Sequence, residues 1–130
     1  MQIPEFIDIE LAIAIHDDLI DTFGGSLGIR DLGLLESALA QPQASFFGTL
    51  LHKNIEEQAA AYLYHICKNH PFVDGNKRTA LAAMEAFLGI NGWELNISNQ
   101  DLENLVLDVA NDRLDKSSVT EIIKEHLIQT

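Results

Sequence analysis

Apolar residues recur three or four positions apart along almost the whole chain, and this spacing is the strongest constraint on its fold. The pattern predicts an all-α protein of about six helices packed in one bundle. The length of 130 residues fits one domain, residues 1–130, with a single continuous core. Only residues 70–78 break the pattern with a dense group of polar side chains, between two strongly apolar helical segments.

Capping and breaking residues set the expected limits of the helices. The first helix follows Asp8 and stops at the glycine pair 24–25, and a second begins at Asp31 and ends before Pro42. The third is capped by Asn54 and runs to about residue 69, and the fourth spans about 77–90. Residues 93–96 are expected to be briefly extended, Ser98 to cap a fifth helix, and Ser117 or Ser118 to start a sixth. The buried stripe predicted for the first helix is Leu11, Ala14, Ile15, Leu19 and Phe23.

Charge and composition exclude several classes of function. The chain has 8 Lys and Arg against 20 Asp and Glu, a formal net charge of −12. So few cations cannot form the basic face that nucleic acid or an anionic membrane surface requires. The single cysteine excludes an internal disulfide and a thiolate metal cluster. No apolar run approaches the ~20 residues of a membrane span, and no signal peptide is visible, so we expect a cytoplasmic protein.

The polar segment 70–78, HPFVDGNKR, leads directly into the fourth predicted helix. Gly75 and Asn76 stand at the start of that helix, where free backbone N–H groups and the helix dipole favour an anion. Lys77 and Arg78 add two full positive charges at the same point. We therefore predict a phosphate site here, although Lys77 also fits a solvated helix residue.

Two further groups of this segment suggest a reaction. Asp74 offers the oxygen ligands that Mg²⁺ prefers, usually together with substrate phosphates. His70 has an ordinary pKa near neutrality and suits a general base. A base, a metal ligand and a phosphate site together predict transfer of a phosphoryl or nucleotidyl group to a hydroxyl.

The segment resembles the signature of the Fic/Doc family, His-x-Phe-x-(Asp/Glu/Asn)-(Gly/Ala)-Asn-(Gly/Lys)-Arg, at all seven defined positions. The likeness is strongest to the Doc branch, the death-on-curing toxins of toxin–antitoxin pairs. It extends to residues 28–39 before the segment and to residues 79–81, 87–88 and 91–92 after it. The resemblance implies a Fic-like bundle in which the active loop lies between two central helices.

The resemblance also implies a role for each residue of the segment. His70 would accept the proton of a target Ser, Thr or Tyr hydroxyl, Phe72 would anchor the loop in the core, and Asp74 would hold Mg²⁺ on the phosphates of ATP. The remaining implied phosphate-binding residues are Gly75, Asn76 and Arg78.

Lys77 and Leu81 distinguish the two branches of the family. Nucleotide-transferring Fic proteins have glycine and a second arginine at these places, whereas the Doc branch shares the lysine and lacks that arginine. The resemblance thus implies transfer of the γ-phosphate of ATP to a protein, with elongation factor Tu as target and a block of translation as result. Pro71, Asp74 and Gly75 fit a Fic-type AMP transferase as the alternative. A third reading is a catalytically silent module that binds a partner through its acidic surface.

Regulation and target docking are expected from two other segments. Self-inhibited Fic proteins carry (Ser/Thr)-x-x-x-Glu-(Gly/Asn), whereas residues 117–122, SSVTEI, end in isoleucine. We therefore expect a separate antitoxin whose disordered tail folds on this chain. Residues 43–53 lack helical spacing and predict a loop or short extended flap, whose Phe46 and Phe47 would either dock the target or close the core. Helical histidines outside the motif, namely His16, His65 and His126, are assigned to packing or the surface.

Overall fold

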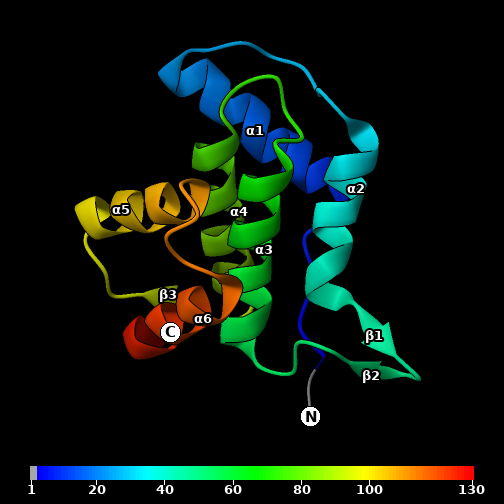
Figure 1. Ribbon diagram of the computed structural model, residues 1–130, viewed down its shortest axis with the longest axis vertical. Helices are drawn as coiled ribbons and strands as arrows, with labels where there is room; N and C mark the ends of the chain where they lie inside the picture. Colours follow the sequence, from blue (N-terminus) through cyan, green and yellow to red (C-terminus); the bar gives the residue numbers. More distant parts are fainter. Residues whose placement is uncertain (1–2) are drawn as a thin grey trace.

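The computed structural model describes residues 3–130, and within that range it contains six α-helices and two short antiparallel strand pairs (Figure 1). The elements are α1 (Ile9–Phe23), α2 (Leu32–Ala40), η1 (Gln41–Gln43), β1 (Ser45–Phe46), β2 (Thr49–Leu50), α3 (Ile55–Asn69), α4 (Asn76–Ile90), β3 (Trp93–Leu95), α5 (Asn99–Ala110), α6 (Lys116–His126) and β4 (Leu127–Gln129). The all-α prediction is confirmed. In the part of the chain that is described, no helix has the length and apolar character needed to cross a membrane.

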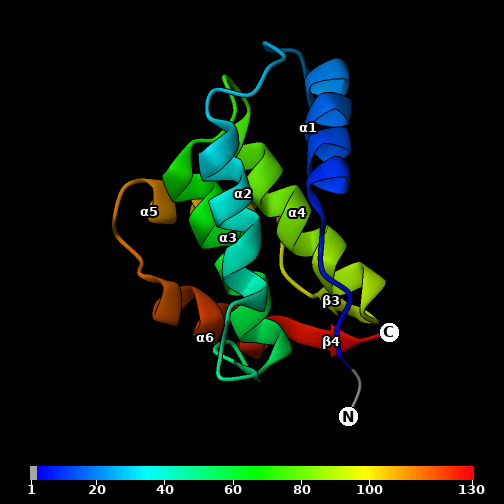
Figure 2. The same ribbon diagram turned by 90° about the vertical axis from the view of Figure 1, so that its right-hand side faces the viewer.

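Helix α3 forms the centre of the bundle. It packs most extensively against α4 and also contacts α2, α5 and α6 (Figures 1 and 2). Its middle is buried on nearly every side, because the small residues Ala59, Ala60 and Ala61 allow the neighbouring helices to approach closely. Tyr62 and Phe87 fill the space between α3 and α4, with their rings 5.0 Å apart. The loop that joins these two central helices therefore starts and ends on the most extensively packed pair of helices in the described structure.

Helix α1 lies along α4 and is rotated relative to the prediction (Figure 2). Asp8 caps it as predicted, accepting a hydrogen bond from the Leu11 N–H (2.8 Å). Of the predicted stripe, Leu11, Ala14 and Phe23 are exposed, and Ile15 and Leu19 are half-buried. The buried residues of α1 are instead Ala12, His16 and Ile20. The stripe prediction was wrong because α1 carries apolar residues on two faces, so that contacts with the loop and α4 select the face that turns inward.

The other helix starts show which capping predictions hold. Side-chain caps are confirmed at Asp31 and Ser98. Helix α6 starts earlier than predicted, because Asp115 rather than a serine is its cap and accepts the Ser118 N–H (2.8 Å). Asn54 stands at the N-cap position of α3 but donates to the Glu57 carboxylate instead of accepting a backbone N–H.

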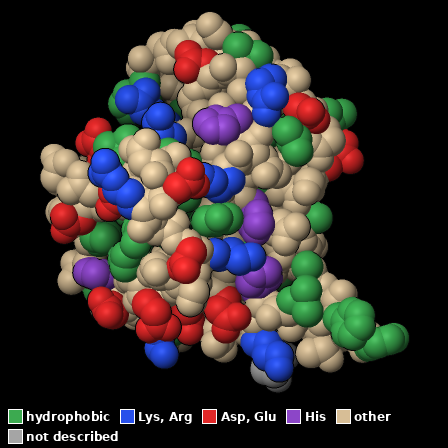
Figure 3. Space-filling view, in the orientation of Figure 1, with side chains coloured by type: hydrophobic (Ala, Val, Ile, Leu, Met, Phe, Trp, Pro, Cys, Tyr) green, Lys and Arg blue, Asp and Glu red, His purple; other side chains and the backbone are tan. Residues whose placement is uncertain are grey.

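Residues 45–50 form the predicted flap, a small hairpin of β1 and β2 that projects from the bundle (Figure 1). Phe47 and Gly48 make its tip, and both have a positive φ, of 50° and 78°. The two aromatic side chains are exposed, Phe47 by 91% and Phe46 by 65%, so they do not close the core. Figure 3 shows hydrophobic side chains gathered at this projecting corner of the surface.

A second strand pair joins α4 and the end of the described chain. β3 pairs with β4, with Trp93 opposite Gln129 and Leu95 opposite Leu127. The extended segment at 93–95 was predicted, but its partner was not. Strand β4 follows α6 directly, and nothing in its own short sequence distinguishes it from a further helical turn.

Candidate active site

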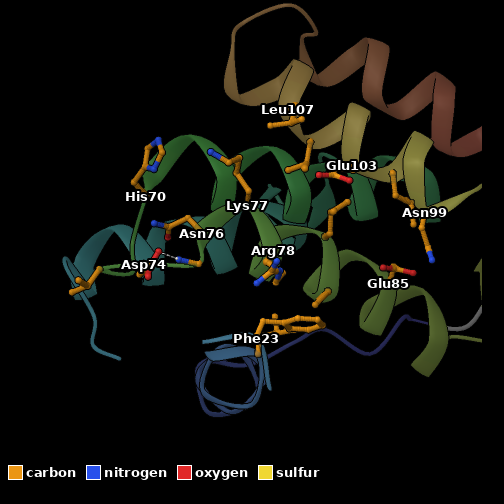
Figure 4. Close-up of a pocket in the computed structure, with 17 residues that line it drawn as sticks. Phe23, His70, Asp74, Asn76, Lys77, Arg78, Glu85, Asn99, Glu103 and Leu107 are labelled. Atoms are coloured by element: carbon orange, nitrogen blue, oxygen red, sulfur yellow. Dashed lines mark hydrogen bonds between the residues drawn. The ribbon is translucent and has the colours of Figure 1, made fainter. Parts of the chain in front are cut away.

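A cleft of about 760 Å³ is lined by the loop between α3 and α4, the first turns of α4, the last turn of α1 and one face of α5 (Figure 4). Its near wall includes six residues of the predicted segment, namely His70, Asp74, Gly75, Asn76, Lys77 and Arg78. The other lining residues include Phe23 of α1, Glu85 of α4, and Asn99, Glu103 and Leu107 of α5. The fold therefore gathers the polar residues of the segment on one concave surface. Phe46 and Phe47 do not line this cleft.

His70 is the residue at which α3 ends and the loop begins. Its backbone is left-handed (φ 47°, ψ 54°), a conformation that non-glycine residues adopt only with support. Arg30 supplies that support by donating from Nε to the His70 carbonyl oxygen (2.6 Å) and from Nη2 to that of Asn69 (2.8 Å). The imidazole is exposed on the cleft wall. An accessible histidine is thus held on a backbone that a distant arginine stabilises.

The segment before α2 clamps the loop along its length. The N–H groups of Arg30 and Asp31 both donate to the Pro71 carbonyl oxygen (2.7 and 3.1 Å), and the Val73 N–H donates to the Gly28 carbonyl (3.0 Å). Ile29 and Phe72 form an isolated antiparallel bridge. The loop is therefore paired like a strand edge rather than left free in solvent.

Phe72 and Asn76 close the loop on itself. The Phe72 side chain is 1% exposed and belongs to the main core. The Asn76 side chain accepts the Phe72 N–H and donates to the Phe72 carbonyl, both at 2.9 Å. Both hydrogen-bonding ends of the Asn76 amide are therefore engaged within the loop. The Asn76 side chain therefore closes the loop with one of its two amide N–H donors left over, and its backbone N–H has no acceptor among the described residues.

The Asp74 carboxylate is held at the mouth of the cleft by two backbone donors. Its oxygens accept the Gly75 N–H (2.9 Å) and the Ser26 N–H (3.1 Å). Gly25 permits this approach, because a Cβ there would lie 2.6 Å from Asp74 Oδ2. The sequence indicated the glycine pair 24–25 only as a helix stop, so this contact was missed. Each carboxylate oxygen keeps a further lone pair for a cation.

The start of α4 leaves its backbone donors free. Gly75, left-handed at φ 78°, stands at the N-cap position without a side-chain cap. Among the described residues, the N–H groups of Asn76, Lys77 and Arg78 have no hydrogen-bond acceptor. The Arg78 guanidinium lies 4.3 Å from the centre of the Phe23 ring, which orients it along the cleft. In Figure 4 the Lys77 side chain extends on the His70 side of the helix, away from Arg78.

Charge is unevenly distributed along the cleft. Lys77, Arg78 and the Asp74 carboxylate lie at the loop end, with one net positive charge, whereas the carboxylates of Glu85 and Glu103 lie at the far end (Figure 4). Partial desolvation raises the pKa of Glu85 above its ordinary value. A phosphate chain is therefore favoured at the loop end, and the far end suits an uncharged or cationic group.

His16 packs in the interior, which agrees with its assignment to packing or the surface, but its contact with the loop was not predicted. It is buried directly beneath the loop, with its ring stacked on Phe72. It does not line the cleft. The motif itself contains no signal for this contact, because His16 precedes the loop by more than fifty residues.

Comparison with known proteins agrees with this geometry. Residues 6–88 match the Fic/DOC family, a span that includes α1, residues 28–31 that pair with the loop, the loop itself and most of α4. The chain is 43% identical over 99 residues to "Toxin Doc" of Mycolicibacterium smegmatis, covering 75% of this chain and 76% of that protein. It is 32% identical over 115 residues to "Protein kinase doc" of Escherichia phage P1, covering 88% and 90%. The chain therefore belongs to the Fic/DOC family, in its Doc branch.

Proposed function

We propose that this protein is a toxin that transfers the γ-phosphate of ATP to a hydroxyl group of a target protein. The observation that carries the proposal is the convergence of His70, Asp74 and the uncapped start of α4 on one cleft. The relative from phage P1, 90% of whose length is covered, bears the name of a protein kinase. Elongation factor Tu is the proposed target, and its modification would block translation.

His70 acts as the general base in this proposal. Its exposed imidazole takes the proton of the target hydroxyl, whose oxygen then forms a bond to the γ-phosphorus. The bond from that phosphorus to the bridging oxygen breaks, and ADP leaves with the electron pair. Positioned general bases contribute about 10² to 10⁴-fold to such reactions.

The residues around His70 fit ATP and Mg²⁺. The unpaired N–H groups at the start of α4, together with Arg78, offer donors to phosphate oxygens. Lys77 adds a charge on the His70 side of the helix, which favours a phosphate next to the base. The exposed Asp74 carboxylate would hold Mg²⁺, and that ion would neutralise charge developing on the phosphates.

Neutralisation by a separate antitoxin is part of the proposal. Residues 117–122 lie on α6, and no residue of α6 lines the cleft. Glu121 therefore occupies no position from which it could block the phosphate site. The basic loop end of the cleft and the exposed Phe23 and Val73 at its rim leave a surface for the tail of a partner.

An AMP transferase is the second candidate. Gly75, which stands at the N-cap of α4 with φ 78°, favours it because glycine at this position matches the wider Fic pattern. Leu81 opposes it, since this apolar residue lines the cleft where Fic-type enzymes carry a second arginine. The two reactions differ in which phosphorus of ATP reaches the protein, and that difference is measurable.

The test uses purified protein, Mg²⁺, elongation factor Tu and ATP labelled at either the γ- or the α-phosphate. His70→Ala is compared with His126→Ala, whose ring hydrogen-bonds within α6 to the Ile122 carbonyl. Transfer of γ-label that only His70→Ala abolishes supports the kinase. Transfer of α-label establishes the AMP transferase. If neither label is transferred to any protein in a lysate and His70→Ala remains toxic to cells, the protein is a silent binding module.

A further inference from the structure

His16 is buried beneath the active loop, and the proposed reaction assigns it no task. It lies on α1, its side chain is 1% exposed, and it turns inward toward the loop rather than into the cleft. A buried histidine requires partners for its ring nitrogens. Its partners therefore indicate what the ring does.

The ring makes two contacts with the loop. It stacks face to face on Phe72, with centroids 3.9 Å apart and planes 4° apart. Its Nε2 lies 2.7 Å from the Asp74 carbonyl oxygen. Because a carbonyl oxygen only accepts hydrogen bonds, Nε2 must carry the proton. On its other edge, Nδ1 lies 3.2 Å from Oδ1 of the neighbouring Asp17.

The contacted carbonyl belongs to the peptide that joins Asp74 to Gly75. A peptide is planar, so a hydrogen bond that fixes its carbonyl also fixes the direction of its N–H. That Gly75 N–H donates to the Asp74 carboxylate. Gly75, whose N–H belongs to this peptide, has a left-handed backbone and stands at the N-cap position of α4. A Cβ on Gly75 would lie only 3.7 Å from His16 Nε2, so ring and loop are in direct contact.

We propose that His16 is a positioning residue that holds the Asp74–Gly75 peptide from beneath through its Nε2–H. It thereby sets the orientation of the Asp74 carboxylate and of the free N–H groups at the start of α4. This inference rests on the proposed function, because it assigns those groups to Mg²⁺ and phosphate. His16 touches neither the substrate nor the reacting atoms.

Two substitutions distinguish the effect of the Nε2–H donor from the effect of the stacked ring. His16→Phe keeps a flat buried ring against Phe72 and removes the donor, whereas His16→Gln keeps an N–H donor and removes the ring. His126→Phe is the matched control, because His126 is a partly buried helical histidine on α6 that does not line the cleft. Near-ultraviolet circular dichroism shows whether each variant is folded at the assay temperature.

We expect His16→Phe to lower kcat for phosphate transfer about 10- to 100-fold, the range that misplacement of catalytic groups produces. The Mg²⁺ concentration for half-maximal rate should rise, and the KM for the target protein should not change. His16→Gln should recover part of kcat. A purely structural role would lower the active fraction without moving the Mg²⁺ dependence, and that result overturns the proposal.

A second measurement does not depend on activity. Long-range ¹⁵N spectra of the wild-type protein report which nitrogen of His16 is protonated, and we expect a proton on Nε2. The Gly75 amide resonance should shift in His16→Phe and not in His126→Phe. An unprotonated Nε2, or an unchanged Gly75 resonance, overturns the proposal. If the wild-type protein transfers no phosphate, the proposed function fails, and the spectra still decide the role of His16.

Discussion

The two connections at the ends of α3 are held in opposite ways. The loop after α3 is paired with residues 28–31, supported from beneath by His16 and closed by the Asn76 amide. The flap before α3 is a hairpin with two residues in each strand and an exposed aromatic tip. One connection thus has most of its backbone carbonyls and several of its N–H groups engaged by other segments, and the other presents apolar surface to solvent (Figures 1 and 3).

This difference matches the tasks proposed for the two segments. Group transfer needs its base, metal ligand and phosphate donors at fixed positions, because small displacements lower the rate steeply. Docking a protein chain needs exposed apolar area and free strand edges. We therefore expect substitutions around the loop to change catalysis, and substitutions in the flap to change target affinity.

The largest effect is expected from Gly25→Ala. Its Cβ would lie 2.6 Å from Asp74 Oδ2, at a backbone φ of 122° that side chains rarely adopt. The carboxylate must move, so transfer should fall about 100-fold and require more Mg²⁺. Gly24→Ala is the matched control, because it has a φ of 86° and no heavy atom within 4 Å of its Cβ. Equal rates and equal Mg²⁺ titrations for the two variants would show that the close approach of Gly25 does not set the position of the Asp74 carboxylate.

A smaller effect is expected from Arg30→Ala. The change removes two donors to the last carbonyls of α3 and leaves the left-handed His70 unsupported. The free energy of unfolding should fall by about 1–2 kcal/mol, as for hydrogen bonds to a charged donor in an exposed place. Arg113→Ala serves as control, since its surface contact with Asp108 (3.6 Å) should contribute less than about 0.5 kcal/mol. Urea denaturation measures the free energy of unfolding of both variants. Similar decreases in the two variants would refute the assignment of Arg30 as a support of the His70 backbone.

The contact between His65 of α3 and Lys116 at the start of α6 should respond to pH. Burial, followed by the nearby charge of Lys116, lowers the pKa of His65 from its ordinary value of 6.5 to about 4. The unfolded chain therefore binds more protons between these values, and stability should decrease as pH falls from 6.5 toward 4. With solvent screening of this half-buried ring, the loss is about 1–2 kcal/mol.

Urea denaturation at pH 7.5 and 4.5 measures this effect. His65→Gln removes the titrating ring that contacts Lys116 Nζ through its Nε2 at 3.1 Å. The variant should lose less stability over this range than the wild-type protein. An identical loss in both proteins would assign the pH dependence to other groups.

The smallest effect on stability is expected from Phe47→Asn. Asparagine tolerates the positive φ of 50° better than phenylalanine, so the free energy of unfolding should stay within about 0.5 kcal/mol of the wild-type value. If the flap docks the target, the KM for the target protein should rise several-fold while kcat is kept. An unchanged KM would leave the flap without a docking role.

Much of the fold could be predicted from local patterns. Asp8, Asp31 and Ser98 marked helix starts because capping involves residues only three positions apart. The irregular composition around Phe46 and Phe47 indicated the flap. The segment 70–78 was found for the same reason, since its polar residues are consecutive and the start of α4 brings them together.

The supports of the site were not predictable in this way. Arg30, Ser26 and His16 reach the loop across 40, 48 and 58 positions of the chain, respectively. The rotation of α1 was missed for a related reason, because its apolar residues occupy two faces. Local spacing thus determined which segment carries the chemical groups and where most helices begin. Only tertiary packing decided which face of α1 turns inward and what holds the loop, because those contacts form between residues that are neighbours only after folding.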